Sequence, residues 1–418
     1  MKQKMVKLLP VAAAMALMGA SAAHAEGFSY GGYFRAGAGL GAQKGQNRTC
    51  YQAVGSDWKY RLGNECDYYG EFMLAYGAGK KDETQYNIYW MPNFYSGGVS
   101  DASSLGGNAT PVHTEQLYGE VVHPDFAPNT TWWAGSRFYG RQNGNMNDTF
   151  YVNMSGTGGG VDIDVGGPVV GLALFRNDDT ATKPGTRFNV DVNNLPAGFR
   201  LTLAVTKGDF NGGQNGTAVS LQNHQSVFGG DNFAWVQFAQ GSAGLNEGFG
   251  GLTSGSDVKG FRLADNLTAQ FNPTLGGEFT LAYQENKCST TGNCANANAA
   301  VAAAYNGALK HTSVAGRLAV GFPGVKNFKV DGELAWDSVK WPGGNIGTAS
   351  MTKFTIAPTI TGGPGYNDRP EIRFYVTTAH WNSGNNAAAT LIQGTNGYSD
   401  LGGKTNGTSY GVQIETWF

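Results

Sequence analysis

The sequence is poor in charged residues and has no long apolar run after its first residues. Asp, Glu, Lys and Arg make up 14% of the 418 residues, where about 25% is usual in globular proteins. The 29 basic and 31 acidic residues leave a formal net charge of −2, which argues against a nucleic-acid partner held by phosphate attraction. Past residue 25 no segment approaches the roughly 18 consecutive apolar residues that a membrane-spanning helix needs.

The N-terminal residues have the pattern of an export signal. Lys2, Lys4 and Lys7 form a basic start, an apolar stretch follows, and the small residues Ala-His-Ala at 23–25 suit cleavage. We predict a signal peptide at residues 1–25 and an exported mature chain at residues 26–418.

The chain has 4 cysteines, which allow three disulfide pairings. Local pairing of Cys50 with Cys66 and of Cys288 with Cys294 is favoured, because each bond closes a short loop in an exported protein. Metal binding is the weaker alternative, since neither pair has CxxC spacing or a nearby His cluster. We expect neither a metal nor a cofactor.

Glycine and aromatic residues are abundant instead. The 64 glycines and 12% aromatic residues suit many short strands with aromatic girdles. Over residues 59–73 polar and apolar residues alternate, which predicts one β-strand with an apolar face toward lipid and a polar face toward a water-filled lumen. The apolar face carries Tyr60, Leu62, Tyr68 and Phe72; the polar face carries Lys59, Arg61, Glu65, Asp67, Tyr69 and Glu71.

The same alternation recurs through the chain, for example over residues 28–40, 328–337, 371–377 and 410–418. Long loops rich in Gly and Asn alternate with short turns, as in outer-membrane barrels. We therefore predict an all-β fold, a single transmembrane antiparallel β-barrel of roughly 16 to 18 strands. The stretch 142–148 is predicted to fold inward and narrow the channel. A soluble β-sandwich or lectin is the alternative fold, because its strands also alternate.

Four motifs indicate which kind of outer-membrane barrel the sequence resembles. They are KYRLGNEC at 59–66, WAGSRFY at 133–139, RPEIR at 369–373 and the WF ending at 417–418. They resemble the maltoporins, the trimeric 18-stranded sugar porins of the outer membrane, to which the sucrose porin is related. The resemblance is strong over residues 31–156 and from 369 to the end. It implies a homotrimer in outer-membrane lipid that lets maltose and maltodextrin-type oligosaccharides diffuse along a track of aromatic rings.

By position, the resemblance implies two sets of binding residues. The aromatic track is expected at Tyr33, Tyr69 and Trp417, and at the less well matched Phe233 and Tyr366. The polar constriction is expected at Arg35, Arg61, Glu71, Arg141, Asp148 and Phe150. A ring suits the apolar face of a pyranose, and Arg and Glu suit its hydroxyls.

Some positions depart from the family's pattern. Thr114 stands where the family has Arg, Phe150 where it has Tyr, and Asn153 where it has Asp. The ring that a loop contributes to a neighbouring subunit is sought among Trp90, Phe94 and Tyr95. The departures leave open a porin for another oligosaccharide, and a general diffusion porin is the other alternative.

Each functional assignment has a structural alternative. Tyr33 and Tyr69 suit a girdle facing lipid headgroups, and Trp417 suits an interfacial anchor. Arg35 and Arg61, with Glu71, suit an ion-pair ladder on the wall.

Two further patterns are weaker evidence of a metal site or a catalytic site. The acidic residues at 331, 333 and 337 are expected to form a solvated wall, with calcium binding the lesser alternative. The Gly-x-Ser-x-Gly pattern at 27–31 lacks the strand-turn-helix context of a hydrolase, so no enzyme is expected.

Overall fold

The computed structural model describes residues 27–42, 48–79, 83–97, 112–176, 185–209, 213–245, 251–252, 259–288, 299–392 and 403–418. The predicted signal peptide and Cys294, and with it the Cys288–Cys294 bond, lie outside these residues. The strands are β1 (Gly27–Gly41), β2 (Asp67–Ala78), β3 (Gln85–Gly97), β4 (His113–Val122), β5 (Thr130–Arg137), β6 (Gln142–Gly144), β7 (Thr149–Val152), β8 (Gly156–Asp164), β9 (Val169–Arg176), β10 (Gly185–Leu195), β11 (Phe199–Gly208), β12 (Asn215–Val227), β13 (Gly230–Gln240), β14 (Ala243–Gly244), β15 (Gly251–Leu252), β16 (Lys259–Asn272), β17 (Leu275–Cys288), β18 (Gly307–Phe322), β19 (Val325–Lys340), β20 (Thr348–Thr361), β21 (Glu371–Trp381) and β22 (Asn406–Trp417). The helices are η2 (Pro196–Gly198), α2 (Ala299–Tyr305) and α3 (Ser383–Ile392).

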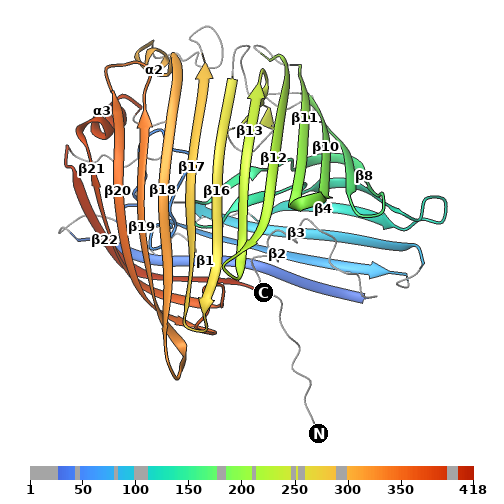
Figure 1. Ribbon diagram of the computed structural model, residues 1–418, viewed down its shortest axis with the longest axis horizontal. Coiled ribbons are helices and arrows are strands. Elements are labelled where there is room, and N and C mark those ends of the chain that lie inside the picture. The colour runs from blue at the N-terminus through green and yellow to red at the C-terminus, as the bar shows by residue number, and fades with distance from the viewer. Residues whose placement is uncertain are drawn as a thin grey trace.

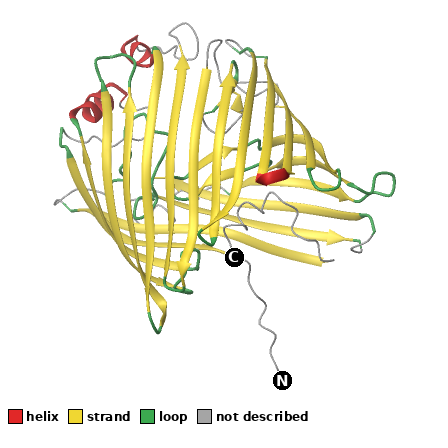
Figure 2. Ribbon diagram, viewed as in Figure 1, coloured by secondary structure: helices red, strands yellow, loops and turns green. Residues whose placement is uncertain are grey.

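One antiparallel sheet of 18 strands closes on itself as a barrel (Figures 1 and 2). Each strand pairs with its neighbours along the chain, and β6, β7, β14 and β15 stand apart in two small sheets. The last strand, β22, pairs with β1, where Trp417 lies opposite Tyr33. Closure leaves the large sheet without an edge, as a sheet that spans lipid requires. No helix in the described parts of the chain has the length and apolar character to cross a membrane.

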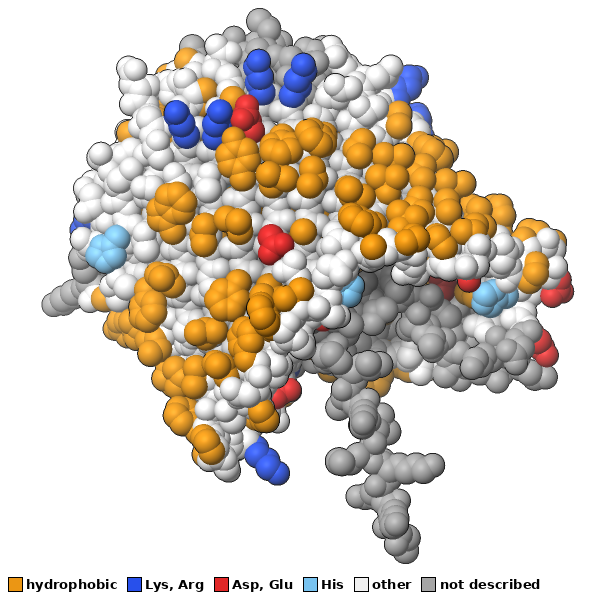
Figure 3. All heavy atoms as spheres, in the orientation of Figure 1, with side chains coloured by type: hydrophobic (Ala, Val, Ile, Leu, Met, Phe, Trp, Pro, Cys, Tyr) orange, Lys and Arg blue, Asp and Glu red, His pale blue; other side chains and the backbone are white. Residues whose placement is uncertain are grey.

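The two faces of the wall differ as the alternation predicts. On β19, Leu334 and Trp336 are 56% and 42% exposed on the outside, whereas Glu333 and Asp337 are buried inside. On β1 the outward Phe28 is 67% exposed. Apolar side chains gather in large patches on the side of the outer face seen in Figure 3. The predicted transmembrane barrel is confirmed.

The two ends of the barrel are unlike. At one end, the turn end, strands are joined by short connections such as 165–168 and 323–324. At the other, the loop end, the connections are long and carry α2 and α3 (Figure 1). In outer-membrane barrels the short turns face the periplasm and the longer loops face the outside.

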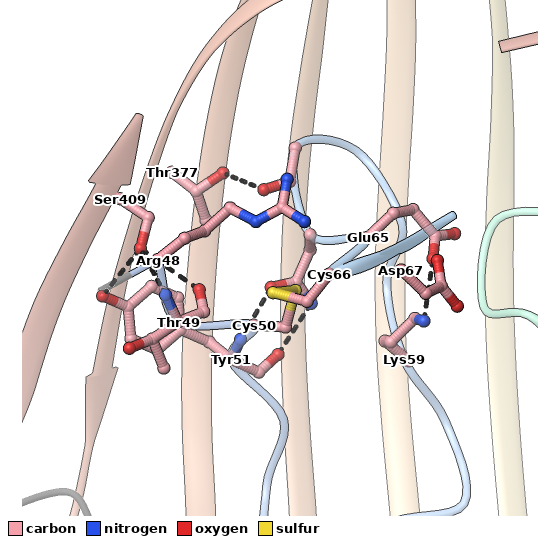
Figure 4. Close-up of a disulfide and its surroundings, with 12 residues drawn as sticks. Arg48, Thr49, Cys50, Tyr51, Lys59, Glu65, Cys66, Asp67, Thr377 and Ser409 are labelled. Carbon is pink, nitrogen blue, oxygen red and sulfur yellow. Dashed lines mark hydrogen bonds and ion pairs between the residues drawn. A yellow bond between two sulfur atoms is a disulfide. The ribbon is translucent and has the colours of Figure 1, made fainter. Parts of the chain in front are cut away.

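The connection between β1 and β2 folds into the lumen. We call its residues 48–66 the first inner segment. A disulfide between Cys50 and Cys66 ties its ends together, as predicted (Figure 4). The segment crosses to the opposite wall, where the Trp58 ring stacks on His311 of β18 at a centroid distance of 3.7 Å. Its turn depends on Gly63, which has a φ of 59° and leaves no room for a Cβ beside the Tyr375 ring.

The connection between β5 and β8, residues 138–155, also folds inward, as predicted for 142–148. This second inner segment contains the hairpin β6–β7. The Tyr151 ring stacks on Trp235 of β13 at 4.4 Å, and the Glu278 carboxylate of β17 accepts a hydrogen bond from the Met146 amide. The two inner segments meet where the Lys59 amide donates to the Asn147 carbonyl at 3.1 Å.

The predicted strand over residues 59–73 is wrong in its first half. Strand β2 begins only at Asp67, and residues 59–66 belong to the first inner segment. Tyr60 and Leu62, predicted to face lipid, are 4% and 0% exposed inside the lumen. Both are covered by the far wall, since Tyr60 Oη bonds Ser313 and the Leu62 side chain packs against Ala357 and Tyr375.

The acidic residues of β19 are not the solvated wall that the sequence suggested. Asp331, Glu333 and Asp337 are buried. Glu333 accepts a hydrogen bond from the Leu62 amide of the first inner segment, and Asp337 bonds His311, which in turn bonds Ser56 of that segment. Glu333 accepts bonds from Arg317 at 2.9 Å and lies 3.2 Å from the Lys353 ammonium. In the described parts of the chain no three His, Cys, Asp or Glu side chains group closely enough to hold a metal ion.

Candidate functional site

A constriction cavity of about 270 Å³ lies where the two inner segments approach β1 and β2. It brings together every residue predicted for the polar constriction and two of those predicted for the aromatic track. Its lining comprises Tyr33, Arg35, Arg61, Tyr69, Glu71, Arg141, Asn143, Gly144, Asn145, Asp148, Thr149 and Phe150. Asn143, Asn145 and Thr149 were not predicted as binding residues, although they lie in or next to the Asn-rich stretch predicted to fold inward.

Two tyrosines form the aromatic part of this cavity. The rings of Tyr33 and Tyr69 lie 6.0 Å apart on β1 and β2. Tyr33 Oη donates to Glu415 at 2.8 Å, and Tyr69 Oη donates to Glu71 at 2.6 Å. Their polar partners and their place in the lumen rule out a girdle that faces lipid. Tyr95 of β3 lies opposite Tyr69 in register.

Ion pairs occupy much of the polar part. Arg35 makes a bidentate contact to Asp67, with distances of 2.9 and 2.7 Å. Arg61 pairs with Glu65, and its Nη2 lies 3.0 Å from the Glu415 carboxylate. The two arginines are therefore ion-paired on the wall, but the predicted partner Glu71 is wrong: their partners are Asp67, Glu65 and Glu415, whereas Glu71 accepts a hydrogen bond from Tyr69.

Glu65 is the acidic centre of this ladder. Burial acts to raise the pKa of its carboxyl, but Lys59, Arg61 and Arg35 outweigh burial and hold that pKa well below its usual range. The Lys59 ammonium lies 2.8 Å from the carboxylate (Figure 4). The charges that hold the first inner segment against β1 are thus the charges beside the cavity.

Arg141 differs from the other arginines. Its guanidinium carbon lies 3.2 Å from the ring centre of Phe138 and 4.4 Å from that of Phe150, so two rings enclose it. Burial lowers the pKa of this guanidinium from its usual value. Among the described residues, its Nε has no hydrogen-bond partner. Since Nε is itself buried, only the terminal nitrogens of the guanidinium are placed to donate into the constriction cavity that Arg141 lines.

Asp148 supplies an accepting group to the same cavity. It is exposed, and its φ of 54° turns it out of the second inner segment. Its carboxylate lies 3.5 Å from the Lys59 ammonium and 3.7 Å from Arg61 Nε. Arg141 and Asp148 thus line the same ring-edged cavity, one as a donor and one as an acceptor.

A second, smaller cavity of about 100 Å³ adjoins the first and shares Arg141, Asn143 and Asn145 with it. It is lined by Trp417 and Phe233, as the predicted track requires. Tyr366 is not among its lining residues. That ring is buried, and its Oη donates to Glu278 at 2.8 Å.

Arg369 changes the surroundings of Trp417. The Arg369 guanidinium carbon lies 3.8 Å from the Trp417 ring centre and covers one face of the indole. Trp417 is 7% exposed, and its Nε1 has no hydrogen-bond partner in the described structure. Its place in the lumen is not that of an interfacial anchor.

The remaining candidates lie outside both cavities. Trp90, Phe94 and Tyr95 belong to strand β3 and not to a loop, so the loop assumption made for them is wrong. Phe94 packs on the outer face against Phe34 and Phe72 at 6.3 and 6.2 Å. The Thr114 hydroxyl accepts a bond from the Trp90 indole, and Asn153 accepts one from Ser155.

One cluster has the residue types of a hydrolytic triad. Ser56 Oγ lies 3.0 Å from His311 Nε2, and Asp337 Oδ1 lies 2.5 Å from the same nitrogen. A relay requires serine and aspartate at opposite ring nitrogens. All three side chains are also buried beneath Trp58. The cluster fixes the first inner segment to β18.

A closed 18-stranded transmembrane barrel, with two inner segments that narrow its lumen to a polar and aromatic constriction, defines an outer-membrane porin. Its fold is that of a channel rather than an enzyme. Over residues 28–418 the chain matches the LamB porin family, and it belongs to that family.

Solved porin structures with distant sequences resemble the chain. OpdQ of Pseudomonas aeruginosa is 9% identical, with 94% of this chain and 98% of that chain covered and a TM-score of 0.47. A BenF-like porin from Pseudomonas fluorescens Pf-5 is 10% identical, with 94% and 97% covered and a TM-score of 0.49. OccD3 (OpdP) of Pseudomonas aeruginosa is 11% identical, with 96% and 93% covered and a TM-score of 0.49. Likeness at this level carries no information about the solute.

Proposed function

We propose that this porin is sugar-selective and lets oligosaccharides of the maltodextrin type diffuse passively through its lumen. The observation that carries the proposal is the constriction cavity, in which the rings of Tyr33, Tyr69 and Phe150 lie beside the guanidinium of Arg141 and the carboxylate of Asp148. Rings and hydrogen-bonding groups in one gap match the apolar face and the hydroxyl rim of a pyranose.

The strength of each contact suits transport. Stacking of a sugar on one ring contributes about 1 kcal/mol, by analogy with aromatic pairs. A hydrogen bond exchanged with water contributes about as much. A few such contacts give a millimolar dissociation constant, about −4 kcal/mol. Weak binding of this kind allows a solute to enter and leave, which conduction through a selective pore requires.

Single-channel recording in a planar bilayer tests the proposal. Maltodextrins of increasing length, added on one side, are expected to block the ion current at millimolar concentration, and longer chains should block for longer. Sucrose at the same concentration is the comparison sugar. Ion current that no sugar reduces, with a strong preference for one ion sign, would instead indicate a general diffusion porin.

Arg369 favours a second candidate, a porin for another oligosaccharide. A linear maltodextrin needs successive open ring faces, but Arg369 covers one face of Trp417, and Tyr366 is turned toward Glu278. A panel that includes raffinose and anionic oligosaccharides separates the candidates, because block by one of these at lower concentration than by maltohexaose would favour the second.

We also propose that the chain works as a homotrimer, as its family resemblance implies. The outer face of β1–β3 carries exposed aromatic side chains such as Phe28, Tyr30 and Tyr86, and such a surface suits burial against a second subunit. Cross-linking in outer-membrane fragments, followed by electrophoresis without heating, is expected to give a trimer band. A band at the monomer position alone would contradict the proposal.

A further inference from the structure

Four lysines lie side by side on the outer face of the barrel at its loop end. They are Lys259 on β16, Lys287 on β17, Lys310 on β18 and Lys340 on β19, and we call them the lysine rim. All four are exposed and share the outward parity of the apolar residues on their strands. Basic side chains gather above the apolar patches in this view (Figure 3). The rim thus stands at the level where the outer leaflet has its headgroups.

The register opposes like charges. Lys259 lies directly opposite Lys287, and Lys310 lies directly opposite Lys340. Like charges in directly opposed positions destabilise a sheet. Glu285 is the one acidic side chain within ion-pair distance of any rim lysine among the described residues, 3.4 Å from Lys310. The barrel alone does not account for this arrangement, and an anion bound between the lysines does.

An apolar groove lies immediately below and beside the rim. Its volume is about 460 Å³, and its lining includes Phe238, Phe261 and Val219, the lysines Lys259 and Lys287, and Glu285, the carboxylate that pairs with Lys310. The two phenylalanine rings lie 5.0 Å apart and form its floor. Phe238 is 53% exposed, so the floor is open to the lipid. Positive charge above an apolar groove matches a molecule with phosphates at one end and acyl chains at the other.

We propose that the lysine rim binds the phosphorylated glycolipid of the outer leaflet, lipopolysaccharide. Its phosphates lie between the opposed lysines, and an acyl chain lies in the groove over Phe238 and Phe261. The loop end faces outward in barrels of this kind, which places the rim in the leaflet that contains this lipid. Bound phosphate replaces repulsion between the lysines with charge-assisted hydrogen bonds.

The first test is a titration of the purified barrel, in nonionic detergent, with lipopolysaccharide, followed by native mass spectrometry. The double variant Lys259→Gln/Lys287→Gln is expected to weaken binding about tenfold, as loss of charge-assisted hydrogen bonds predicts. Lys326→Gln, at the turn end, is the control and is expected to bind like the wild type. Dephosphorylated lipopolysaccharide should bind the wild type as weakly as intact lipid binds the double variant. Equal affinity for both lipids, or equal loss in Lys326→Gln, overturns the proposal.

The second test uses the sign of a stability change. Without glycolipid, the double variant is expected to unfold at the same temperature as the wild type or higher, because an opposed pair of like charges is gone. With glycolipid it should unfold at a lower temperature than the wild type. A shift in the same direction under both conditions overturns the proposal. So does disulfide formation between copies that carry Lys287→Cys, because a second subunit then covers this face.

Discussion

Replacing Arg141 tests how this porin holds its solute. Arg141→Met keeps an apolar stem between Phe138 and Phe150 but removes the guanidinium donors. No hydrogen bond to the wall is lost at Nε, since that atom has no partner among the described residues. The barrel should therefore fold, which heat-modifiable migration in electrophoresis would check.

The expected loss follows from the contacts. One or two hydrogen bonds from a charged donor to sugar hydroxyls, in a lumen that water reaches, contribute about 1 kcal/mol in total. The concentration of maltohexaose that halves the ion current should then rise about fivefold. Removal of a positive charge at the narrowest part should also raise the preference for cations.

Arg176→Met is the matched control, because Arg176 lies on the outer face of β9 and is exposed. It should leave both block and selectivity unchanged. If Arg141→Met gives open channels of normal conductance that maltohexaose blocks at the wild-type concentration, then Arg141 does not contact the solute and the role inferred from its place in the cavity is refuted.

Four more outcomes follow from the constriction and its support. Tyr69→Ala should weaken sugar block about fivefold through loss of roughly 1 kcal/mol of stacking, whereas Tyr69→Phe should change it little; equal effects would argue against stacking. The pKa of the Glu65 carboxyl is depressed, so its stabilisation is complete above the ordinary glutamate pKa of about 4 and is lost as pH falls further. Open-channel noise should accordingly rise only in strong acid, and Glu65→Gln should be noisy at every pH, as current recordings across pH would show. Replacing Cys50 and Cys66 by Ser removes a disulfide that stabilises the folded protein by up to about 3 kcal/mol. A protease added at the loop end should therefore cut residues 48–66 in the variant and not in the wild type. Trp58→Ala removes the stack on His311 at a cost of roughly 3 to 5 kcal/mol; unitary conductance should increase, and an unchanged value would mean that the first inner segment stays in place without it.

Sequence reasoning predicts the barrel wall well, because period-2 alternation is a local consequence of one face toward lipid and one toward water. Residues 28–40 and 328–337 fold as expected for that reason. The same reasoning fails over residues 59–66. Tyr60 packs on β18 and β19, and Leu62 packs on β20 and β21, all far away in sequence, and nothing in the local pattern distinguishes that far wall from lipid.

Arg61 lies in the lumen as predicted, but the physical reason for that prediction was wrong. Its parity placed it in the lumen as part of a strand, whereas it reaches the lumen because the whole first inner segment does. The resemblance to maltoporins placed it independently of strand assignment, as it did Arg141 and Asp148. Neither the polar–apolar alternation nor the resemblance to maltoporins predicts the surroundings of Trp417. The cover from Arg369 depends on how 362–370 packs against β22, a contact that neither alternation nor motif encodes.

The polar lumen has two tasks that compete for the same side chains. An 18-stranded barrel is too wide for its own side chains to fill, so the two inner segments supply its interior packing. Buried charges on the wall then need partners, and Arg35, Arg61 and Glu333 are paired as a result. A solute can use only the groups that this packing leaves free. Selectivity should therefore follow from Arg141, from the open ring faces and from the part of Asp148 that its contacts to Lys59 and Arg61 leave exposed, and a relative with the same charges but another pairing should admit another solute.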